Sequence, residues 1–185
     1  MKNSFTETEI KEYLKANLQA EKYRHTLGVT ALALELARKN GVSLEKTRLA
    51  ALLHDAGKEI KRHKKYLKYV KFDRYEKKIR PVWHNKLGVV IAQKYFNVKD
   101  KTVLNAIQRH STAAKTMSAL DKIIYVADIA ERNRKFKDAV TIRKAALRNL
   151  NEGFILALAK KIEYVLVKKK TIHPKSIEAW NNYVK

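Results

Sequence analysis

Apolar side chains recur along this chain at the three- and four-residue spacing of helices that bury one face. In the first such segment Ile10, Leu14 and Leu18 form a stripe, and Thr6 precedes Glu9 at the spacing of a capping box. No stretch alternates apolar and polar residues for long enough to predict a strand. We therefore expect an all-α fold. The predicted helices span residues 7–19, 22–39, 44–55, 86–96, 101–110 and 119–131.

The C-terminal part of the chain continues the helical pattern. A long helix is predicted over 138–168, with a break near Gly153. A turn at Pro174 and a short final helix follow, and we expect Trp180 and Tyr183 to dock that helix on the rest of the protein.

Residues 58–80 are the least regular part of the sequence, with Lys and Arg interleaved with Tyr and Phe up to Pro81. The default interpretation is a surface loop with a short helix. The basic part, 61–80, could line a substrate entrance or contact RNA, but a solvated face is the usual meaning of such a charge run.

Length and composition agree with one helical domain. The chain has 185 residues, 45% of them hydrophobic, with only 5 Gly and 2 Pro. We expect a single domain over 1–185, with a core of about 20–135 and a helical extension over 138–185. The absence of Cys excludes disulfides and thiolate metal sites and is consistent with a cytoplasmic location. Neither a signal peptide nor a membrane span of about 20 apolar residues is expected.

The formal net charge is +23. One interpretation is a phosphate-rich partner such as a nucleotide, a nucleic acid or a membrane surface. The other is a general preference for Lys at exposed helix positions, which we favour for most of the charge because Lys is spread along the whole chain.

Candidate chemistry begins with the adjacent pair His54-Asp55, which ends an apolar helical segment. His25 and Asp128 also lie in apolar helical stretches, where an unpaired polar group would be costly to bury. His110 ends its predicted helix and His84 precedes another. Imidazole nitrogens and carboxylate oxygens without sulfur suit iron, manganese, zinc or nickel.

The number of candidate ligands exceeds the needs of one ion. His25, His54, Asp55 and Asp128 supply most of one coordination shell, so His84 and His110 suit a second ion, with the Asp55 carboxylate as the bridge. Two such metals can clamp a phosphoryl group and activate water. The sequence thus predicts a two-metal phosphohydrolase.

Six segments of the sequence resemble the YqeK branch of the HD-domain superfamily: YRHTLGV, AALLHDAGKE, WHNKLGVVIA, LNAIQRHST, SALDKIIYVADIAERNRKF and IHPKSIEAWN. The resemblance runs from about residue 9 to residue 183. It implies a single-domain HD helical bundle and symmetrical hydrolysis of diadenosine tetraphosphate to two ADP. It also implies two divalent ions, with iron expected and manganese, nickel or zinc as alternatives. By position, the implied ligands are His25, His54, Asp55, His84, His110 and Asp128.

Three segments depart from the family pattern. Residues 111–113 read Ser-Thr-Ala where two Thr and a Gly are usual. Residues 83–86 read Trp-His-Asn-Lys where small residues and Pro are usual. Residues 132–134 read Arg-Asn-Arg where Pro-Gly-Arg is usual. All six implied ligands are present.

Nearby cations and hydroxyls are candidates for binding phosphate. Lys58 lies three residues beyond Asp55, and Arg132 lies one helical turn past Asp128, so both are expected to act in catalysis and binding together with Asp55. Arg109 is a weaker candidate because neighbours on a helix diverge in direction. The hydroxyl groups of Ser111 and Thr112 would donate hydrogen bonds to phosphate or to a ligand, or would cap a loop.

Three other aromatic or imidazole side chains receive structural assignments. His63 and His173 are expected to be structural or solvated, because neither lies on an apolar face. Trp83 is expected to pack over the metal site, with stacking on adenine as the alternative.

Two alternative functions stay open. Other HD proteins hydrolyse alarmones, deoxynucleotides or cyclic dinucleotides, although His84 and His110 disfavour those that use one metal. A basic RNA- or ribosome-associated protein with a vestigial metal site is the alternative outside enzymes, and nucleic acid is a less favoured partner than a small nucleotide. No oligomeric state is predicted.

Overall fold

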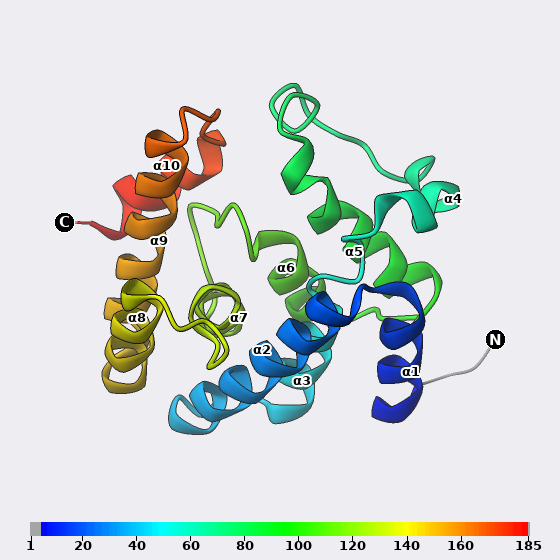
Figure 1. The fold of residues 1–185 in the computed structure, drawn as a ribbon, viewed down its shortest axis with the longest axis horizontal. Helices are drawn as coiled ribbons and strands as arrows, with labels where there is room; N and C mark the ends of the chain where they lie inside the picture. Colours follow the sequence, from blue (N-terminus) through cyan, green and yellow to red (C-terminus); the bar gives the residue numbers. More distant parts are fainter. Residues whose placement is uncertain (1–4, 185) are drawn as a thin grey trace.

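The computed structural model describes residues 5–184, so residues 1–4 and 185 of the predicted domain lie outside the described part. The described residues form helices and contain no strand, which confirms the all-α prediction (Figure 1). The longer helices are α1 (Glu7–Asn17), α2 (Ala20–Lys39), α3 (Leu44–Leu53), α5 (Trp83–Lys94), α6 (Lys101–Arg109), α7 (Ala119–Ala130), α8 (Lys137–Arg148), α9 (Leu150–Val167) and α10 (Pro174–Tyr183). Shorter pieces are η1 (Ile60–His63), α4 (Lys64–Leu67) and η2 (Arg80–Val82).

Capping boxes fix the start of two helices, and the one at α1 confirms the prediction. At α1 the Thr6 hydroxyl accepts a hydrogen bond from the Glu9 amide at 3.2 Å, and the Glu9 carboxylate accepts one from the Thr6 amide at 2.8 Å. Ser118 and Asp121 make the same exchange at α7. Each box satisfies amides that a helix start leaves without partners inside the helix.

The predicted long helix 138–168 is two helices, and the predicted break is in the wrong place. The chain is extended at Asn149, whose side chain accepts hydrogen bonds from the amides of Asn151 and Glu152 and caps α9. Gly153 instead lies inside α9, where a Cβ atom would overlap the Cβ of Ala146. Gly153 therefore lets α8 and α9 pack closely rather than ending a helix.

The irregular region before α5 is a loop with two short 3-10 helices and one short α-helix, close to the prediction. Helix α5 begins at Trp83, three residues earlier than predicted, because the 3-10 turn with Pro81 leads directly into it. This earlier start places His84 in the first turn of α5.

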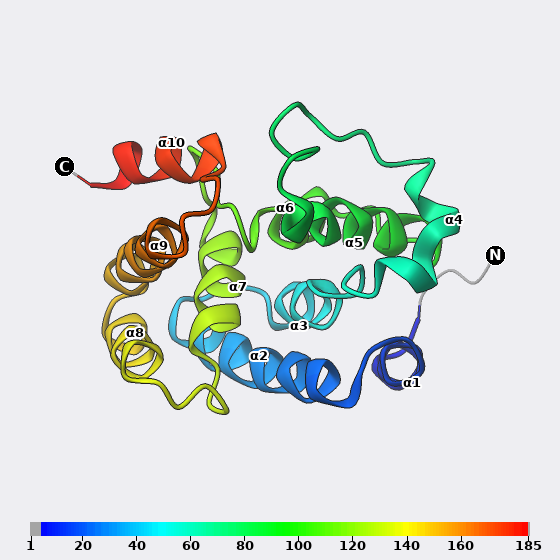
Figure 2. The same ribbon diagram turned by 45° about the horizontal axis from the view of Figure 1, so that its top comes forward.

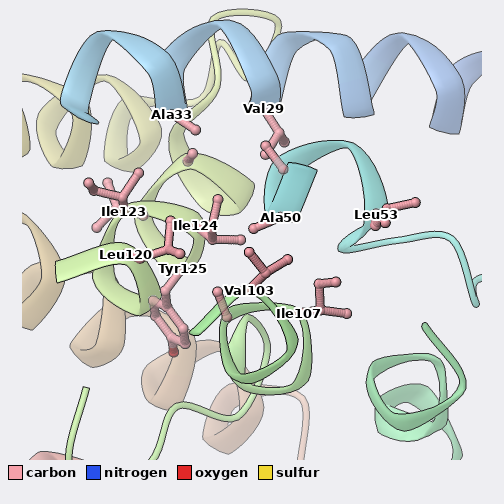
Figure 3. Packing of buried hydrophobic residues seen from close by; sticks show 14 of the residues in the cluster. Val29, Ala33, Ala50, Leu53, Val103, Ile107, Leu120, Ile123, Ile124 and Tyr125 are labelled. Carbon is pink, nitrogen blue, oxygen red and sulfur yellow. The ribbon is translucent and has the colours of Figure 1, made fainter. Parts of the chain in front are cut away.

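Helix α7 runs through the middle of the bundle and packs against α2, α3, α6, α8 and α9. In Figure 2 it lies between α8 and α9 on one side and α3 and α6 on the other. It is apolar on almost every face, as expected for a helix with neighbours all round. Figure 3 shows buried side chains from four helices meeting here: Val29, Ala33, Ala50, Leu53, Val103, Ile107, Leu120, Ile123, Ile124 and Tyr125.

The C-terminal helix α10 is held against the body of the protein. The Tyr183 hydroxyl accepts a hydrogen bond from the Met117 amide at 2.7 Å, and the Tyr183 ring meets Phe154 edge-on. Trp180 packs on the hydrophobic core, so both aromatic residues dock the end of the chain. Over residues 5–184, none of the helices has the length and apolar character that crossing a membrane requires.

Candidate metal centre

Six polar side chains from five helices meet beside α7. His25 lies on α2, His54 and Asp55 follow α3, and Asp128 lies on α7. His84 is in the first turn of α5, and His110 follows α6. The ligand atoms fall into two groups, each within 4.8 Å: His25, His54 and Asp128, and then Asp55, His84 and His110.

Three of the imidazoles are fixed in the same way. The Nδ1 atoms of His54, His84 and His110 lie 2.6, 2.6 and 2.7 Å from the carbonyl oxygen three residues earlier. A carbonyl can only accept, so each Nδ1 carries the proton and donates it. Each Nε2 is therefore bare and faces the cluster, which is the tautomer that binds a metal.

Bare nitrogens at close range suit a bound cation. The Nε2 atoms of His84 and His110 lie 2.9 Å apart, and with both protons on Nδ1 two lone pairs face each other. The Nε2 of His54 is buried and has no hydrogen-bond partner among the described residues. Buried acceptors of this kind are costly unless a proton or a cation satisfies them.

Asp55 lies between the two groups. Its Oδ1 is 3.2 Å from His84 Nε2 and 3.5 Å from His110 Nε2, while Oδ2 is 3.7 Å from His54 Nε2. One carboxylate therefore faces both groups, as a bridging ligand does. Gly57 makes this approach possible, since a Cβ there would lie 2.6 Å from the carbonyl oxygen of His84.

The charge states suit metal binding. Burial alone raises the pKa of Asp55, but the nearby His54 and Lys58 outweigh it and hold that pKa well below its ordinary value. Burial also raises the pKa of Asp128, and the hydrogen bond to His25 and the charge of Lys161 reverse this effect. Burial lowers the pKa of His54 to about 4. Metal ligands must be deprotonated in this way.

The donor set therefore fits two divalent cations. Each group offers imidazole nitrogen and carboxylate oxygen, the ligands that first-row metals share. A comparison with protein families agrees with this chemistry. The family model of the HD domain matches residues 23–133, more than half of the chain. The chain belongs to the HD-domain family.

Two named proteins are similar to this chain over nearly its whole length. The chain is 31% identical to the symmetrical bis(5'-nucleosyl)-tetraphosphatase of Bacillus subtilis (strain 168), covering 91% of this chain and 92% of that protein. It is also 31% identical to the protein of the same name from Halalkalibacterium halodurans, with 92% of each covered. These relatives confirm the resemblance seen in the sequence.

A solved HD structure has the same fold throughout. A crystal structure described as a predicted HD superfamily hydrolase involved in NAD metabolism, from Clostridium acetobutylicum, superimposes with a TM-score of 0.92. The two chains are 32% identical, and 98% of each is covered. The fold found here therefore extends to α8, α9 and α10, beyond the matched HD segment.

We call the six candidate ligands in these two groups the HD cluster. Three predicted substrate contacts lie at or near it. The Lys58 ammonium is 3.2 Å from Asp55 Oδ1 and 3.5 Å from His84 Nε2. Ser111 and Thr112 line an adjoining hollow, but their hydroxyls have protein partners, Asn85 for Ser111 and the Ala113 carbonyl for Thr112. Of the three, Lys58 alone places a charge directly beside the cluster.

Arg132 and Arg109 point elsewhere, contrary to expectation. Helix α7 ends at Ala130, so the helical spacing that would bring Arg132 next to Asp128 does not exist. The Arg132 guanidinium is exposed and pairs with Glu35 at 2.8 Å. Arg109 is adjacent to His110 but diverges from it, and pairs at 2.8 Å with Asp121.

Three residues at the HD cluster escaped the sequence analysis. Glu131 lies 3.3 Å from Nδ1 of His25 and orients that ring, whose Nε2 is 3.0 Å from Asp128. Lys161 reaches Asp128 from α9 at 3.7 Å. Arg134 lines the hollows on both sides of the cluster. A lysine in the apolar segment of α9 was the signal for Lys161, whereas Arg134 stands two residues after the arginine chosen.

The structure changes the roles predicted for two histidines and one tryptophan. His63 and His173 are both buried, so the solvated alternative is wrong and a structural role is left. His173 caps α10 by accepting a hydrogen bond from the Lys175 amide. Trp83 stacks on Phe72 at 4.6 Å and donates to the Glu76 carbonyl, so it supports the loop before α5 rather than covering the cluster.

Proposed function

We propose that the protein is a metal-dependent phosphohydrolase that cuts dinucleoside tetraphosphates, with diadenosine tetraphosphate as the preferred substrate and two ADP as products. The observation that carries this proposal is the meeting of bare imidazole nitrogens and buried carboxylates in two adjoining groups. The names of the two relatives that match over about nine-tenths of the chain support the same reaction.

Each group would hold one divalent ion. His25, His54 and Asp128 would bind the first, His84 and His110 the second, and Asp55 both. Two bound metals would supply a hydroxide at neutral pH and Lewis-acid stabilisation of the phosphoryl oxygens. Iron is our preferred metal, with manganese, nickel and zinc as alternatives that the donor types allow.

The chain's own cations would hold the polyphosphate in place. The Lys58 ammonium, beside Asp55, is close enough to the cluster to bind a non-bridging oxygen of the phosphate under attack. Arg134 lines the hollows on either side and suits the neighbouring phosphates. In the reaction water adds to phosphorus, the bond to the bridging oxygen breaks, and ADP leaves as an anion that these cations stabilise. The cytoplasmic location stays a prediction.

Product analysis tests this function directly. The purified protein, loaded with Fe²⁺ or Mn²⁺, is incubated with diadenosine tetraphosphate, guanosine tetraphosphate and a cyclic dinucleotide. We expect ADP as the only product of the first and slower turnover of the others. ATP plus AMP would contradict a symmetrical cut. Turnover of another nucleotide alone, or no turnover with salt-sensitive RNA binding, would overturn the proposal.

An Asp55→Ala variant connects the reaction to the cluster. Because Asp55 faces both groups, its removal is expected to reduce bound metal and hydrolysis together. Glu163→Ala, at an exposed carboxylate on α9, is the control and should leave both unchanged. Full metal content and full activity in the Asp55 variant would rule out the two-metal reaction.

A further inference from the structure

A narrow hollow of about 290 Å³ opens beside the cluster, between residues 79–82 and the end of α9. Its lining includes His84 and Asp128 of the cluster and the neighbouring Lys58. In Figure 1 the loop before α5 and the turn between α9 and α10 stand on either side of α6. A ligand in this hollow therefore reaches the proposed metal centre.

Apolar side chains line part of the walls away from the cluster, beside the polar Lys170 and Ser176. Ile79 and Val82 line one side, and Val165 and Ile172 line the other. Apolar side chains from two separate segments suit a flat, largely apolar ring such as a nucleobase. The volume is at the lower end of small-molecule pockets, about 300 Å³, so the hollow has room for one nucleoside end and not for two.

A half-buried cation stands between the cluster and these walls. The Lys161 ammonium is 3.7 Å from Asp128 Oδ2 and 3.4 Å from the His110 carbonyl oxygen, and lies over the Tyr125 ring at 4.8 Å. It lines the hollow together with Asp128. A phosphate chain that runs from the cluster into the hollow must pass this charge, which suits a diphosphate.

One residue that lines the hollow has a buried hydroxyl group without a hydrogen-bond partner in the described part of the chain. Tyr125 is fully buried and lines the hollow, and its hydroxyl has no hydrogen-bond partner within residues 5–184. A buried hydroxyl without a partner costs about 1–3 kcal/mol, so it commonly marks a place where water or a ligand binds. A ribose or phosphate oxygen would satisfy it.

The walls are held in place before any ligand binds. Ser176 at the start of α10 donates a hydrogen bond to the Thr112 carbonyl at 2.9 Å, and Tyr183 anchors the other end of α10 to Met117. A preformed pocket loses little conformational entropy on binding. The hollow can therefore select a substrate by its size and shape without a conformational change.

We infer that this hollow is the subsite for one nucleoside diphosphate arm of the substrate, with the base between the apolar walls and the diphosphate at Lys161. The identity of the ligand rests on the proposed function. Hydrolysis at the cluster then leaves a nucleoside diphosphate in the hollow, and the other arm leaves through a wider hollow of about 670 Å³ that His25 and Arg24 line. Because α9 lies beyond the HD match at 23–133, the C-terminal extension becomes part of the active site.

A pair of adjacent substitutions on α9 tests the subsite. Val165→Trp fills the hollow, whereas Leu166→Trp adds the same ring at a neighbouring exposed position, 58% accessible, that does not line it. We measure ADP binding to the metal-loaded protein by calorimetry, inhibition by ADP and by pyrophosphate, and bound metal. Val165→Trp should weaken ADP binding at least about tenfold, the size of a lost steric fit, and leave pyrophosphate inhibition and metal content unchanged. Leu166→Trp should bind ADP like the wild type.

Two further variants keep the test decisive. Ile172→Trp fills the same hollow from the turn after α9 and should give the same result if Val165→Trp does not fold. Lys161→Met should weaken ADP and pyrophosphate alike. Wild-type ADP affinity in either folded tryptophan variant would overturn the subsite. If the wild type binds ADP but does not cut diadenosine tetraphosphate, the proposed reaction fails while the subsite stands.

Discussion

Two clusters of imidazole and carboxylate groups in this protein contain the same residue types but differ in their chemistry. One is the HD cluster around Asp55. The other, which we call the rim cluster, consists of Asp73, Glu76 and His173, where the loop before α5 meets α10. In the rim cluster, and in each of the two groups of the HD cluster, the ligand atoms lie within 4.8 Å of one another. Proximity alone therefore does not separate them.

The hydrogen bond on Nδ1 is the first difference. In the HD cluster Nδ1 of His54 donates to the Ala51 carbonyl, so Nε2 is bare. In the rim cluster Nδ1 of His173 accepts from the Lys175 amide, so Nε2 of the neutral ring carries the proton. That Nε2 lies 3.9 Å from Asp73 and has no acceptor lone pair to offer a metal.

The carboxylates are the second difference. Glu76 in the rim cluster already has a cation, since the Lys86 ammonium is 2.5 Å from Oε2. Asp73 Oδ1 accepts hydrogen bonds from the amides of Tyr75 and Glu76. The HD cluster instead leaves bare nitrogens facing each other. A metal site is thus distinguished by nitrogen lone pairs without a partner, and ligand types within reach of one another are not sufficient.

Matched histidine substitutions are expected to show the largest difference. His54→Gln removes a buried ligand, so we expect loss of bound metal and a decrease in kcat/KM of at least about a hundredfold, since a metal supplies several kcal/mol of transition-state stabilisation. His173→Gln should keep bound metal and lose the cap on α10, about 1 kcal/mol. Metal analysis and product assays measure both. Equal metal loss in the two variants would erase the distinction.

A smaller effect is expected from the carboxylate behind His25. Glu131→Gln keeps the shape but weakens the acceptor at Nδ1 of His25, so we expect metal affinity to fall about tenfold to a hundredfold. Competition with a chelator measures it. Glu35→Gln, at the carboxylate paired with exposed Arg132, is the control and should not change affinity. An unchanged affinity in the Glu131 variant would show that His25 needs no support.

These two substitutions also mark how far the sequence could predict the site. His54 was found because a polar pair ended an apolar helix, which is a local signal. Glu131 and Lys161 were not found, because their contacts depend on where α7 ends and on how α9 crosses it. Arg132 was chosen by continuing α7 two residues beyond its end at Ala130. Periodicity predicted the helices themselves. It did not predict where the side chains point after a helix ends.

The fold prediction shows the same limit. The periodic stripe of α1 and its capping box gave the helix and its first residue. Gly153 was taken as a helix end because Gly is a poor helix former, but close packing on Ala146 decides its role. The extended conformation of Asn149, which separates α8 from α9, has its cause in tertiary packing and capping together.

The carboxylate of Glu76 in the rim cluster depends on the ammonium of Lys86. Lys86→Met leaves the nearly buried Glu76 carboxylate without its ion pair, so we expect the free energy of unfolding to fall by about 1–3 kcal/mol. Chemical denaturation of the metal-loaded protein measures the loss. Since Nε2 of His173 still carries its proton, no additional metal should bind. A third equivalent of metal in this variant would contradict the tautomer argument.

The smallest effect is the pH dependence of the metal-free protein. Burial lowers the pKa of four histidines below the ordinary 6.5, to about 4 for His54 and His84. The other two are His63 and His173. Below pH 6.5 the unfolded chain therefore binds more protons than the native protein, and stability is lost as the pH falls from 6.5 toward 4.

One histidine works in the opposite direction. Burial lowers the pKa of His25, but the hydrogen bond and charge of Asp128 outweigh it and raise the pKa, so this group stabilises the fold at low pH and loses that effect as the pH rises. Four lowered groups oppose one raised group, so the urea midpoint of the metal-free protein should be lower at acid pH than at neutral pH. His173→Gln should reduce the difference, because it removes one lowered group that no metal contacts. A midpoint that rises on acidification would mean that His25 outweighs the buried neutral histidines.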